Sequence, residues 1–249
     1  MSTVQIKNVT LGVGSPKIAV PLVAKNADGL QQAIAGLAGL SFDIVEFRVD
    51  FLDIAADADA VLAQTKIVRQ ALPDTPLLFT FRRAVEGGEC PCSDDYYFDL
   101  VHHAIESGLV DIIDIELFAG DEKVQAAVQA AKAKGVAALL CNHDFDKTPA
   151  KEEITGRLKK MESLGADICK IAVMPQSAAD VLTLLDATQE VYQTAQQPIV
   201  TMSMGKLGVI SRLAGQTFGS AMTFGAAAKA SAPGQIGAND LRRILDTLA

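Results

Sequence analysis

The sequence has few of the features that mark proteins binding nucleic acids or membranes. Lysine and arginine number 22 against 30 acidic residues, and no basic cluster offsets the net charge of −8. Such a chain is a poor partner for a nucleic-acid backbone or an anionic membrane surface. No apolar run approaches the roughly 18 residues that a membrane-spanning helix needs. We therefore expect the remaining arginines to bind a small anionic ligand.

Cysteine is also scarce, and its spacing excludes the common cysteine-based sites. Cys90, Cys92, Cys141 and Cys169 match neither zinc-finger nor C-x-x-C spacing. We expect four free thiols, as in a reducing compartment, and no metal site. The first fourteen residues lack the basic start and apolar run of a signal peptide. Together these absences predict a cytoplasmic protein.

Short apolar or β-branched segments recur along the chain. They lie at 17–23, 42–50, 76–81, 110–117, 136–143, 167–173, 198–204 and 221–226. Stretches of helical periodicity separate most of them, as at 57–72 and 122–134. Dividing 249 residues among eight units gives about 31 residues each, the length of a βα repeat. The sequence therefore predicts an α/β protein with a (β/α)8 TIM barrel.

Two further features complete the predicted architecture. A doubly wound sheet is the weaker alternative, because no G-x-G-x-x-G motif follows the first segment. Residues 1–16 alternate in polarity around Lys7 and Asn8, which predicts a short N-terminal β-hairpin that closes the bottom of the barrel. No linker or low-complexity tract interrupts the chain, so we expect one domain over residues 1–249.

Charged residues gather on one face of the predicted strands. Glu46 and Arg48 alternate with Phe47, and Lys170 alternates with Ile171. The same alternation gives this face Arg82, Asp114, Glu116 and His143. A charged inner face near the carboxyl ends of the strands is typical of a barrel active site. The alternative is a set of ion pairs that fill the barrel, for example Glu46 with Arg48 or Arg82.

Lys170 and His143 are the strongest catalytic candidates. Lys170 lies in the middle of a strand, where poor solvation favours the neutral amine that attacks a ketone or aldehyde. His143 ends a neighbouring strand, in the position of a general base. The alternatives are a buried ion-paired lysine and a core histidine. His102 and His103 lie in a predicted helix and are interpreted as surface or packing residues.

Two glycine-bearing loops follow strands. Gly87 and Gly88 come directly after Glu86, and flexible glycines could place that carboxylate over the site. Residues 231–237, which include Ser231 and Gln235, follow the eighth strand, where barrels often bind an anion. Ordinary surface turns are the alternative for both loops. Met202 and Met204 are more often core residues than parts of a lid.

At these residues the chain resembles the type I 3-dehydroquinate dehydratases, over essentially its whole length. The segments that carry the resemblance are EFRVD at 46–50, FRRAVEGG at 81–88, HDFDKTP at 143–149, KIA at 170–172, TMSMGKLGVISR at 201–212 and ASAPGQ at 230–235. The resemblance implies a homodimeric (β/α)8 barrel of the shikimate pathway. It also implies removal of water from 3-dehydroquinate to give 3-dehydroshikimate, with no metal or cofactor.

The resemblance also implies a role for each candidate. Lys170 would form an imine with the substrate ketone, and His143 would remove the adjacent proton and protonate the departing hydroxyl. Glu86 would orient His143, and Arg212 would bind the substrate carboxylate. The other implied substrate contacts are Glu46, Phe47, Arg48, Arg82, Phe145, Met202, Met204, Ser231 and Gln235.

Four positions depart from the family pattern. They are Pro21 in place of serine, Phe47 in place of tryptophan, Arg83 in place of threonine, and Asn142. Strand alternation turns Phe47 and Asn142 outward, whereas Arg83 adds a charge near Glu86 that could alter loop closure.

Three other functions fit parts of the pattern. A Schiff-base aldolase would use the same lysine but needs a phosphate site. A metal-dependent hydrolase could use Asp114, Glu116 and His143, but no HxH pair supports it. A non-catalytic binding barrel would tolerate loss of Lys170.

Overall fold

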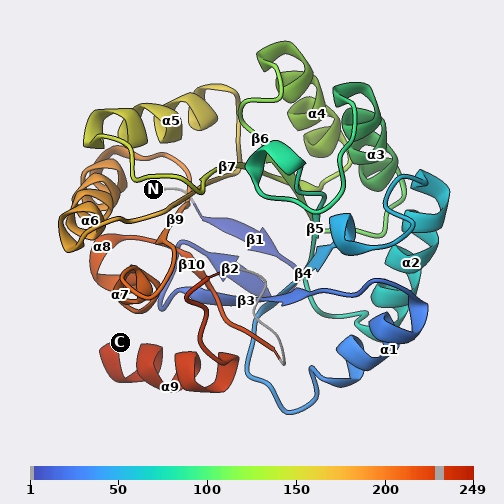
Figure 1. The fold of residues 1–249 in the computed structure, drawn as a ribbon, viewed down its shortest axis with the longest axis horizontal. Coiled ribbons are helices and arrows are strands. Elements are labelled where there is room, and N and C mark those ends of the chain that lie inside the picture. The colour runs from blue at the N-terminus through green and yellow to red at the C-terminus, as the bar shows by residue number, and fades with distance from the viewer. Residues whose placement is uncertain (1–2, 228–232) are drawn as a thin grey trace.

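Eight parallel strands surround the centre of the protein, and helices surround the strands (Figure 1). We analysed a computed structural model, which describes residues 3–227 and 233–249. The barrel strands are β3 (Lys17–Leu22), β4 (Ile44–Arg48), β5 (Leu77–Thr80), β6 (Ile112–Glu116), β7 (Ala137–Asp144), β8 (Ile168–Val173), β9 (Ile199–Ser203) and β10 (Met222–Phe224). Each strand from β3 to β8 pairs with the next in sequence, and β10 pairs with β3. The Ala221 amide donates to the Ile199 carbonyl at 2.8 Å and links β10 to β9. The predicted TIM barrel is confirmed.

Helices follow the strands and cover the outside of the barrel. They are α1 (Ala27–Ala35), α2 (Ala58–Ala71), α3 (Asp94–Glu106), α4 (Asp121–Ala133), α5 (Lys151–Ser163), α6 (Ala178–Thr194), α7 (Val209–Leu213), α8 (Gly215–Phe218) and α9 (Ala238–Leu248). Side chains of Asn26, Asp57, Ser93 and Ser177 cap the amino ends of α1, α2, α3 and α6. Among the described helices, none combines the length and apolar character that crossing a bilayer requires.

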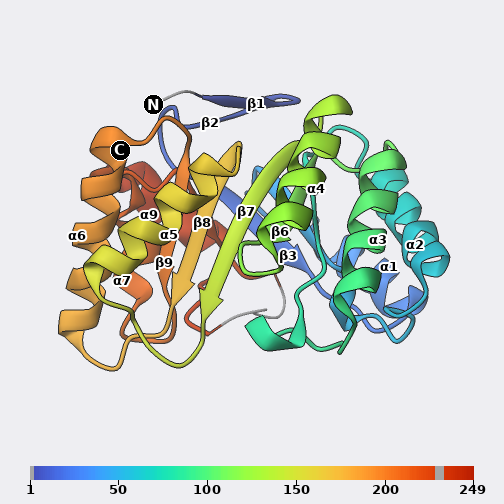
Figure 2. The same cartoon turned by 90° about the horizontal axis from the view of Figure 1, so that it is seen from above.

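The N-terminal hairpin lies across the end of the barrel where the strands begin (Figure 2). It consists of β1 (Val4–Ile6) and β2 (Val9–Leu11), which pair antiparallel around a turn in which Lys7 has φ of 51°. Buried Ile6, Val9 and Leu11 pack onto the apolar residues inside the barrel. The hairpin therefore closes the bottom of the barrel, as predicted.

Alternation along the strands separates two apolar layers. The outer layer fills the space between strands and helices and contains Val45, Phe79 and Ile171. The inner layer fills the barrel and contains Ile44 and Leu78. The faces assigned from the sequence are confirmed, and the charged residues continue the inner face toward the carboxyl ends of the strands.

The strand predicted at 42–50 ends earlier than expected. The segment at 42–50 forms β4 only to Arg48, and a 3-10 turn, η1 (Val49–Phe51), follows. The Arg48 guanidinium donates to both carboxylate oxygens of Asp50, at 2.8 and 2.9 Å. This bidentate pair stabilises the turn and brings Phe51 to the rim of the barrel.

Candidate active site

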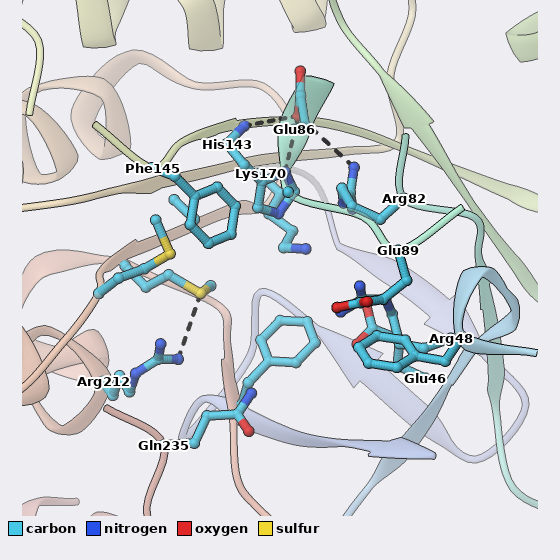
Figure 3. Close-up of a pocket in the computed structure, with 16 residues that line it drawn as sticks. Glu46, Arg48, Arg82, Glu86, Glu89, His143, Phe145, Lys170, Arg212 and Gln235 are labelled. Carbon is cyan, nitrogen blue, oxygen red and sulfur yellow. Dashed lines mark hydrogen bonds and ion pairs between the residues drawn. The ribbon is translucent and has the colours of Figure 1, made fainter. Parts of the chain in front are cut away.

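A cavity opens at the carboxyl ends of the strands (Figure 3). It is lined by predicted site residues from the charged face of the barrel, namely Glu46, Arg48, Arg82, Glu86, His143, Lys170 and Arg212. The predicted contacts Phe145, Met202, Met204 and Gln235 also line it. The fold thus brings together residues that are far apart in sequence, because parallel strands end at the same side of a barrel.

Lys170 lies in the wall of the cavity, in the middle of β8. Its side chain is buried, and Nζ lies 3.9 Å from an oxygen of Asp114 and 4.8 Å from the centre of the Phe224 ring. Lys170 therefore has an ion-pair partner, as the alternative interpretation expected. However, the distance between the two charged groups is long, and the amine still faces the cavity. A primary amine in such a position can attack a carbonyl carbon.

Glu86 and His143 form a hydrogen-bonded pair beside Lys170. An oxygen of Glu86, Oε2, lies 3.0 Å from His143 Nδ1 and accepts the His143 backbone amide at 2.8 Å. With Nδ1–H donating to the carboxylate, Nε2 is left as a base. The pair has the arrangement of a general base and its orienting group.

The backbone path after β5 carries Glu86 over β7. Glu86 ends a 3-10 turn, η2 (Ala84–Glu86), and Gly87 has φ of 81°, a conformation that favours glycine. A Cβ at Gly88 would lie 1.8 Å from the Arg82 carbonyl oxygen, so only glycine fits there. The two glycines allow the tight turn that the sequence suggested.

Burial sets the ionisation of this pair. Burial and the charge of Glu116 raise the pKa of Glu86 to about 7, and the charge of Arg82 opposes the rise. Burial and then the charges of Arg82 and Lys170 lower the pKa of His143 well below its usual value. The imidazole is therefore neutral near pH 7, as a general base must be.

Arg82 belongs to a buried ion-pair network. Nη2 donates to both oxygens of Asp114 at 2.9 Å, and Nη1 donates to Glu116 at 2.9 Å. Arg48 is paired with Asp50, and Glu46 accepts from the Thr80 hydroxyl at 3.1 Å. The suggested pairing of Glu46 with Arg48 or Arg82 is therefore not found among the described ion pairs.

Arg212 differs from the other buried arginines. Its side chain is 1% exposed, yet within the described residues it contacts no carboxylate. Nη2 donates to the Pro233 carbonyl at 3.1 Å, Nη1 contacts the Met202 sulfur at 3.6 Å, and Nε has no partner. Burial lowers the pKa of Arg212 to about 10. A buried cation with free donors facing a cavity is suited to an anionic ligand.

Two predicted contacts do not lie in the described cavity. Phe47 is fully buried in the outer apolar layer, because alternation along β4 turns it away from Glu46 and Arg48. Its assignment to substrate binding is corrected accordingly. Ser231 lies outside the described residues.

Some contacts near the site were not predicted from the sequence. Asp114 and Glu116 were placed on the charged inner face, but their pairing with Arg82 was not predicted. Asn142 points outward along β7 and yet donates to Glu86 at 3.1 Å, because η2 crosses over that strand. Arg83 binds Glu116 and Asp94 rather than Glu86.

Three buried or partly buried side chains of the site offer possible metal ligands. Donor atoms of Glu86, Cys141 and His143 lie within 4.8 Å of one another. However, Arg82 Nη1 lies 3.0 Å from the Cys141 sulfur and 3.8 Å from Glu86. This positive charge opposes a bound cation, and burial raises the pKa of the Cys141 thiol well above its usual value. The trio does not fit a metal ion.

Comparison with known proteins gives one consistent result. A family model described as type I 3-dehydroquinase matches residues 18–249. The 3-dehydroquinate dehydratase of Neisseria meningitidis serogroup A is 60% identical over 247 residues, covering 99% of this chain and 97% of that protein. That of Listeria monocytogenes serovar 1/2a is 54% identical, covering 100% and 98%.

A solved structure is similar over the same length. Type I 3-dehydroquinate dehydratase from Clostridium difficile, with covalently modified comenic acid, superposes with a TM-score of 0.95 at 49% identity. The match covers 99% of this chain and 97% of that one.

Proposed function

The chain belongs to the type I 3-dehydroquinase family, and we propose that it dehydrates 3-dehydroquinate through an imine formed on Lys170. The reaction is that of a carbon–oxygen lyase of the shikimate pathway. It removes one water from 3-dehydroquinate and gives 3-dehydroshikimate.

The observation that carries the proposal is the buried Arg212, which has no carboxylate partner among the described residues, in the same cavity as Lys170 (Figure 3). The substrate carries a carboxylate and a ketone on one ring. A guanidinium with free donors suits the carboxylate, and a primary amine suits the ketone. The inner face therefore offers one group for each end of the substrate.

The first chemical step joins Lys170 to the substrate. Nζ attacks the C3 carbonyl carbon, the carbonyl oxygen leaves as water, and a protonated imine forms. This cation withdraws electrons from C2 far more strongly than the ketone does, so a proton on C2 becomes acidic.

His143 then carries out both proton transfers of the elimination. Nε2 removes the C2 proton, and the electron pair forms an enamine. The enamine expels the C1 hydroxyl, which takes the proton back from His143 and leaves as water. A water molecule hydrolyses the imine, releases 3-dehydroshikimate and restores Lys170, so that one water is lost overall.

The other cavity residues bind and shield the ring. Glu46 and Arg48 are placed to contact hydroxyl groups, with Gln235 at the far side of the cavity. Phe145 lies 6.4 Å from the His143 ring, and Met202 and Met204 are buried beside it. Arg82 was expected to bind hydroxyls, but two carboxylates occupy its guanidinium. We assign it to the electrostatics of Glu86 and His143 instead.

Borohydride reduction in the presence of 3-dehydroquinate tests the imine directly. We expect a stable adduct on the peptide that contains Lys170, identified by mass spectrometry. Lys170→Ala is the control and should give no adduct. Turnover without an adduct would contradict the imine, and absence of both would contradict the assigned substrate.

We further propose that the enzyme is a homodimer. Large apolar side chains are exposed on and next to two helices of one side of the barrel, with Leu182 on α6 66% exposed and Ile210 on α7 51% exposed. Burying such residues favours association. Light scattering should give twice the mass of one chain, and the mass of one chain would contradict the proposal.

A cytoplasmic location is the last part of the proposal. All four cysteines are free thiols, two of them buried and two partly exposed in the sequence Cys90-Pro91-Cys92. Free thiols persist in reducing compartments. Fractionation of cells that produce the protein should find it in the cytoplasmic fraction, and recovery elsewhere would contradict this location.

A further inference from the structure

A chain of hydrogen bonds runs from helix α5 on the outside of the barrel to Glu86. Arg157 of α5 donates from Nη1 to the Oδ1 oxygen of Asn142 at 2.6 Å. Asn142, which is 4% exposed on β7, donates from Nδ2 to Glu86 Oε1 at 3.1 Å. The other oxygen of Glu86 faces His143. Both carboxylate oxygens are thus held, one by Asn142 and one by His143.

Arg157 fixes the orientation of the Asn142 amide. A guanidinium can only donate hydrogen bonds, so the carbonyl oxygen of Asn142 must face Arg157 and its NH2 group must face Glu86. Arg157 is itself held by an ion pair with Glu153 and lies 3.7 Å from Asp144. An asparagine free to rotate could instead present its oxygen to the Glu86 carboxylate, which would repel it.

Other charged groups also face the Glu86–His143 pair, from three strands and from the segment that follows β5. They are Arg48 of β4, Arg82 after β5, Glu116 of β6 and Lys170 of β8. Asp114 and Arg83 lie one contact further away, bound to Arg82 and Glu116 respectively. Asn142 carries no charge, so its effect on Glu86 comes from a hydrogen bond and not from a net charge.

We propose that Asn142 and Arg157 are positioning residues of the dehydration, which orient the Glu86 carboxylate as the acceptor for His143 Nδ1–H. The inference rests on the proposed function. Neither residue lines the cavity, so neither is assigned a contact with substrate. The hydrogen bond from Asn142 also lowers the pKa of Glu86 and so supports the ionised form that accepts from His143.

The pH dependence of kcat separates this role from a purely structural one. Asn142→Ala removes the donor, so the pKa of Glu86 rises and the acid limb of the profile moves to higher pH, by roughly one unit. Activity should recover at alkaline pH. Arg157→Gln should shift the limb in the same direction by a smaller amount, because Asn142 stays but is no longer held.

Lys160→Gln is the matched control for Arg157→Gln. Lys160 lies on the same helix, and its Nζ is 5.6 Å from the centre of the Phe118 ring, the same distance as the Arg157 guanidinium. It pairs with Asp121, and none of the described hydrogen bonds or ion pairs joins it to Asn142. Arg157→Gln and Lys160→Gln each remove one positive charge, but only Arg157→Gln breaks the hydrogen bond to Asn142. We expect no shift in Lys160→Gln.

Two results would overturn the proposal. One is a profile of Asn142→Ala that superimposes on the parent profile. The other is an equal shift in Arg157→Gln and Lys160→Gln, which would make Arg157 a remote charge. Partial unfolding of Asn142→Ala lowers the height of the profile but does not move its limb, so the test survives a loss of stability.

A second measurement does not depend on turnover. The chain has three histidines, and the other two lie on α3, so the ring nitrogens of His143 can be assigned in a 15N-histidine NMR spectrum. We expect the pH at which these signals shift to rise in Asn142→Ala and to stay unchanged in Lys160→Gln. If the parent protein fails to turn over 3-dehydroquinate, the proposed function fails, whereas this titration still tests the contact with Glu86.

Discussion

The two ends of the barrel interior differ in chemistry although the same strands build both. At the amino end, Ile44, Ile112 and Ile168 form an apolar plug that the hairpin covers. Two residues further along each strand, on the same face, lie Glu46, Asp114 and Lys170. The comparison shows that one step of strand alternation separates the part of the barrel that stabilises the fold from the part that binds and reacts.

The side chains at the two ends of the barrel interior also differ in whether they need a hydrogen-bond or ion-pair partner. The plug residues are apolar and need no partner, so each contributes by burial alone. Charges at the carboxyl end need partners, and Arg82 finds two carboxylates whereas Arg212 finds none among the described residues. Substitutions at the two ends should therefore separate activity from stability.

The largest effect is expected from Lys170→Ala. Turnover should fall by several orders of magnitude, because no other described amine lines the cavity to form the imine. Thermal unfolding should change little, since the variant removes a buried charge whose ion pair is long. Activity assays and calorimetry on one preparation check both statements. Retained turnover would favour a non-catalytic role for this lysine.

His143→Ala should reduce turnover by about 10²- to 10⁴-fold, the usual contribution of a general base. It should still form the reduced adduct with Lys170, because nucleophile and base are separate residues. The assay is borohydride trapping followed by peptide mapping. A folded variant that traps no substrate would contradict this division of roles.

Ile112→Ala should show the opposite behaviour at the other end of the barrel. Ile112 is fully buried in the plug, so the variant should lower the free energy of unfolding by about 2–5 kcal/mol. The kcat/KM of the folded fraction should stay within a few-fold of the parent value. Denaturant titration measures the first quantity. A loss of activity as large as that of His143→Ala would erase the contrast between the two ends.

Arg212→Ala should mainly weaken substrate binding. Loss of a charge-assisted contact with the carboxylate is expected to raise KM by about 10- to 100-fold. Stability should not fall comparably, because the guanidinium has no ion-pair partner among the described residues to leave behind. An unchanged KM would count against the carboxylate role.

The smallest expected effect is the contribution of Glu86 to the pH dependence of the free energy of unfolding. Its carboxyl keeps its proton up to about pH 7 in the folded protein, whereas an ordinary glutamate loses it near 4.5. Between these values the folded state binds more protons than the unfolded state, so stability falls as pH rises, by about 1 kcal/mol per pH unit. Glu86→Gln should lack this decline. Denaturant titrations at several pH values give the difference, and parallel curves for both proteins would contradict it.

The sequence predicted much of this arrangement, because strand alternation is a local property. It placed Lys170, His143 and Glu46 on the inner face without knowledge of their neighbours. It could not choose partners within that face, since the pairing of Arg82 with Asp114 depends on how the strands are staggered around the barrel. Asn142 was missed because its contact arises where η2 crosses β7, which no pattern within β7 reveals.

The misassignment of Phe47 to substrate binding has a different origin. Phe47 was taken with its neighbours Glu46 and Arg48 because the three share a motif, although alternation already turned it outward. Its place in the outer apolar layer follows from that alternation. Position within a strand was thus a better guide than membership of a motif.

The pairing of β3 with β10 has a consequence for synthesis of the chain. One edge of β3 stays unpaired until residues 222–224 have been made, roughly 200 residues later. An unpaired strand edge is prone to bind other chains. Most of the barrel therefore emerges from the ribosome before its first and last strands can pair. We expect the chain to be most prone to aggregation during this interval.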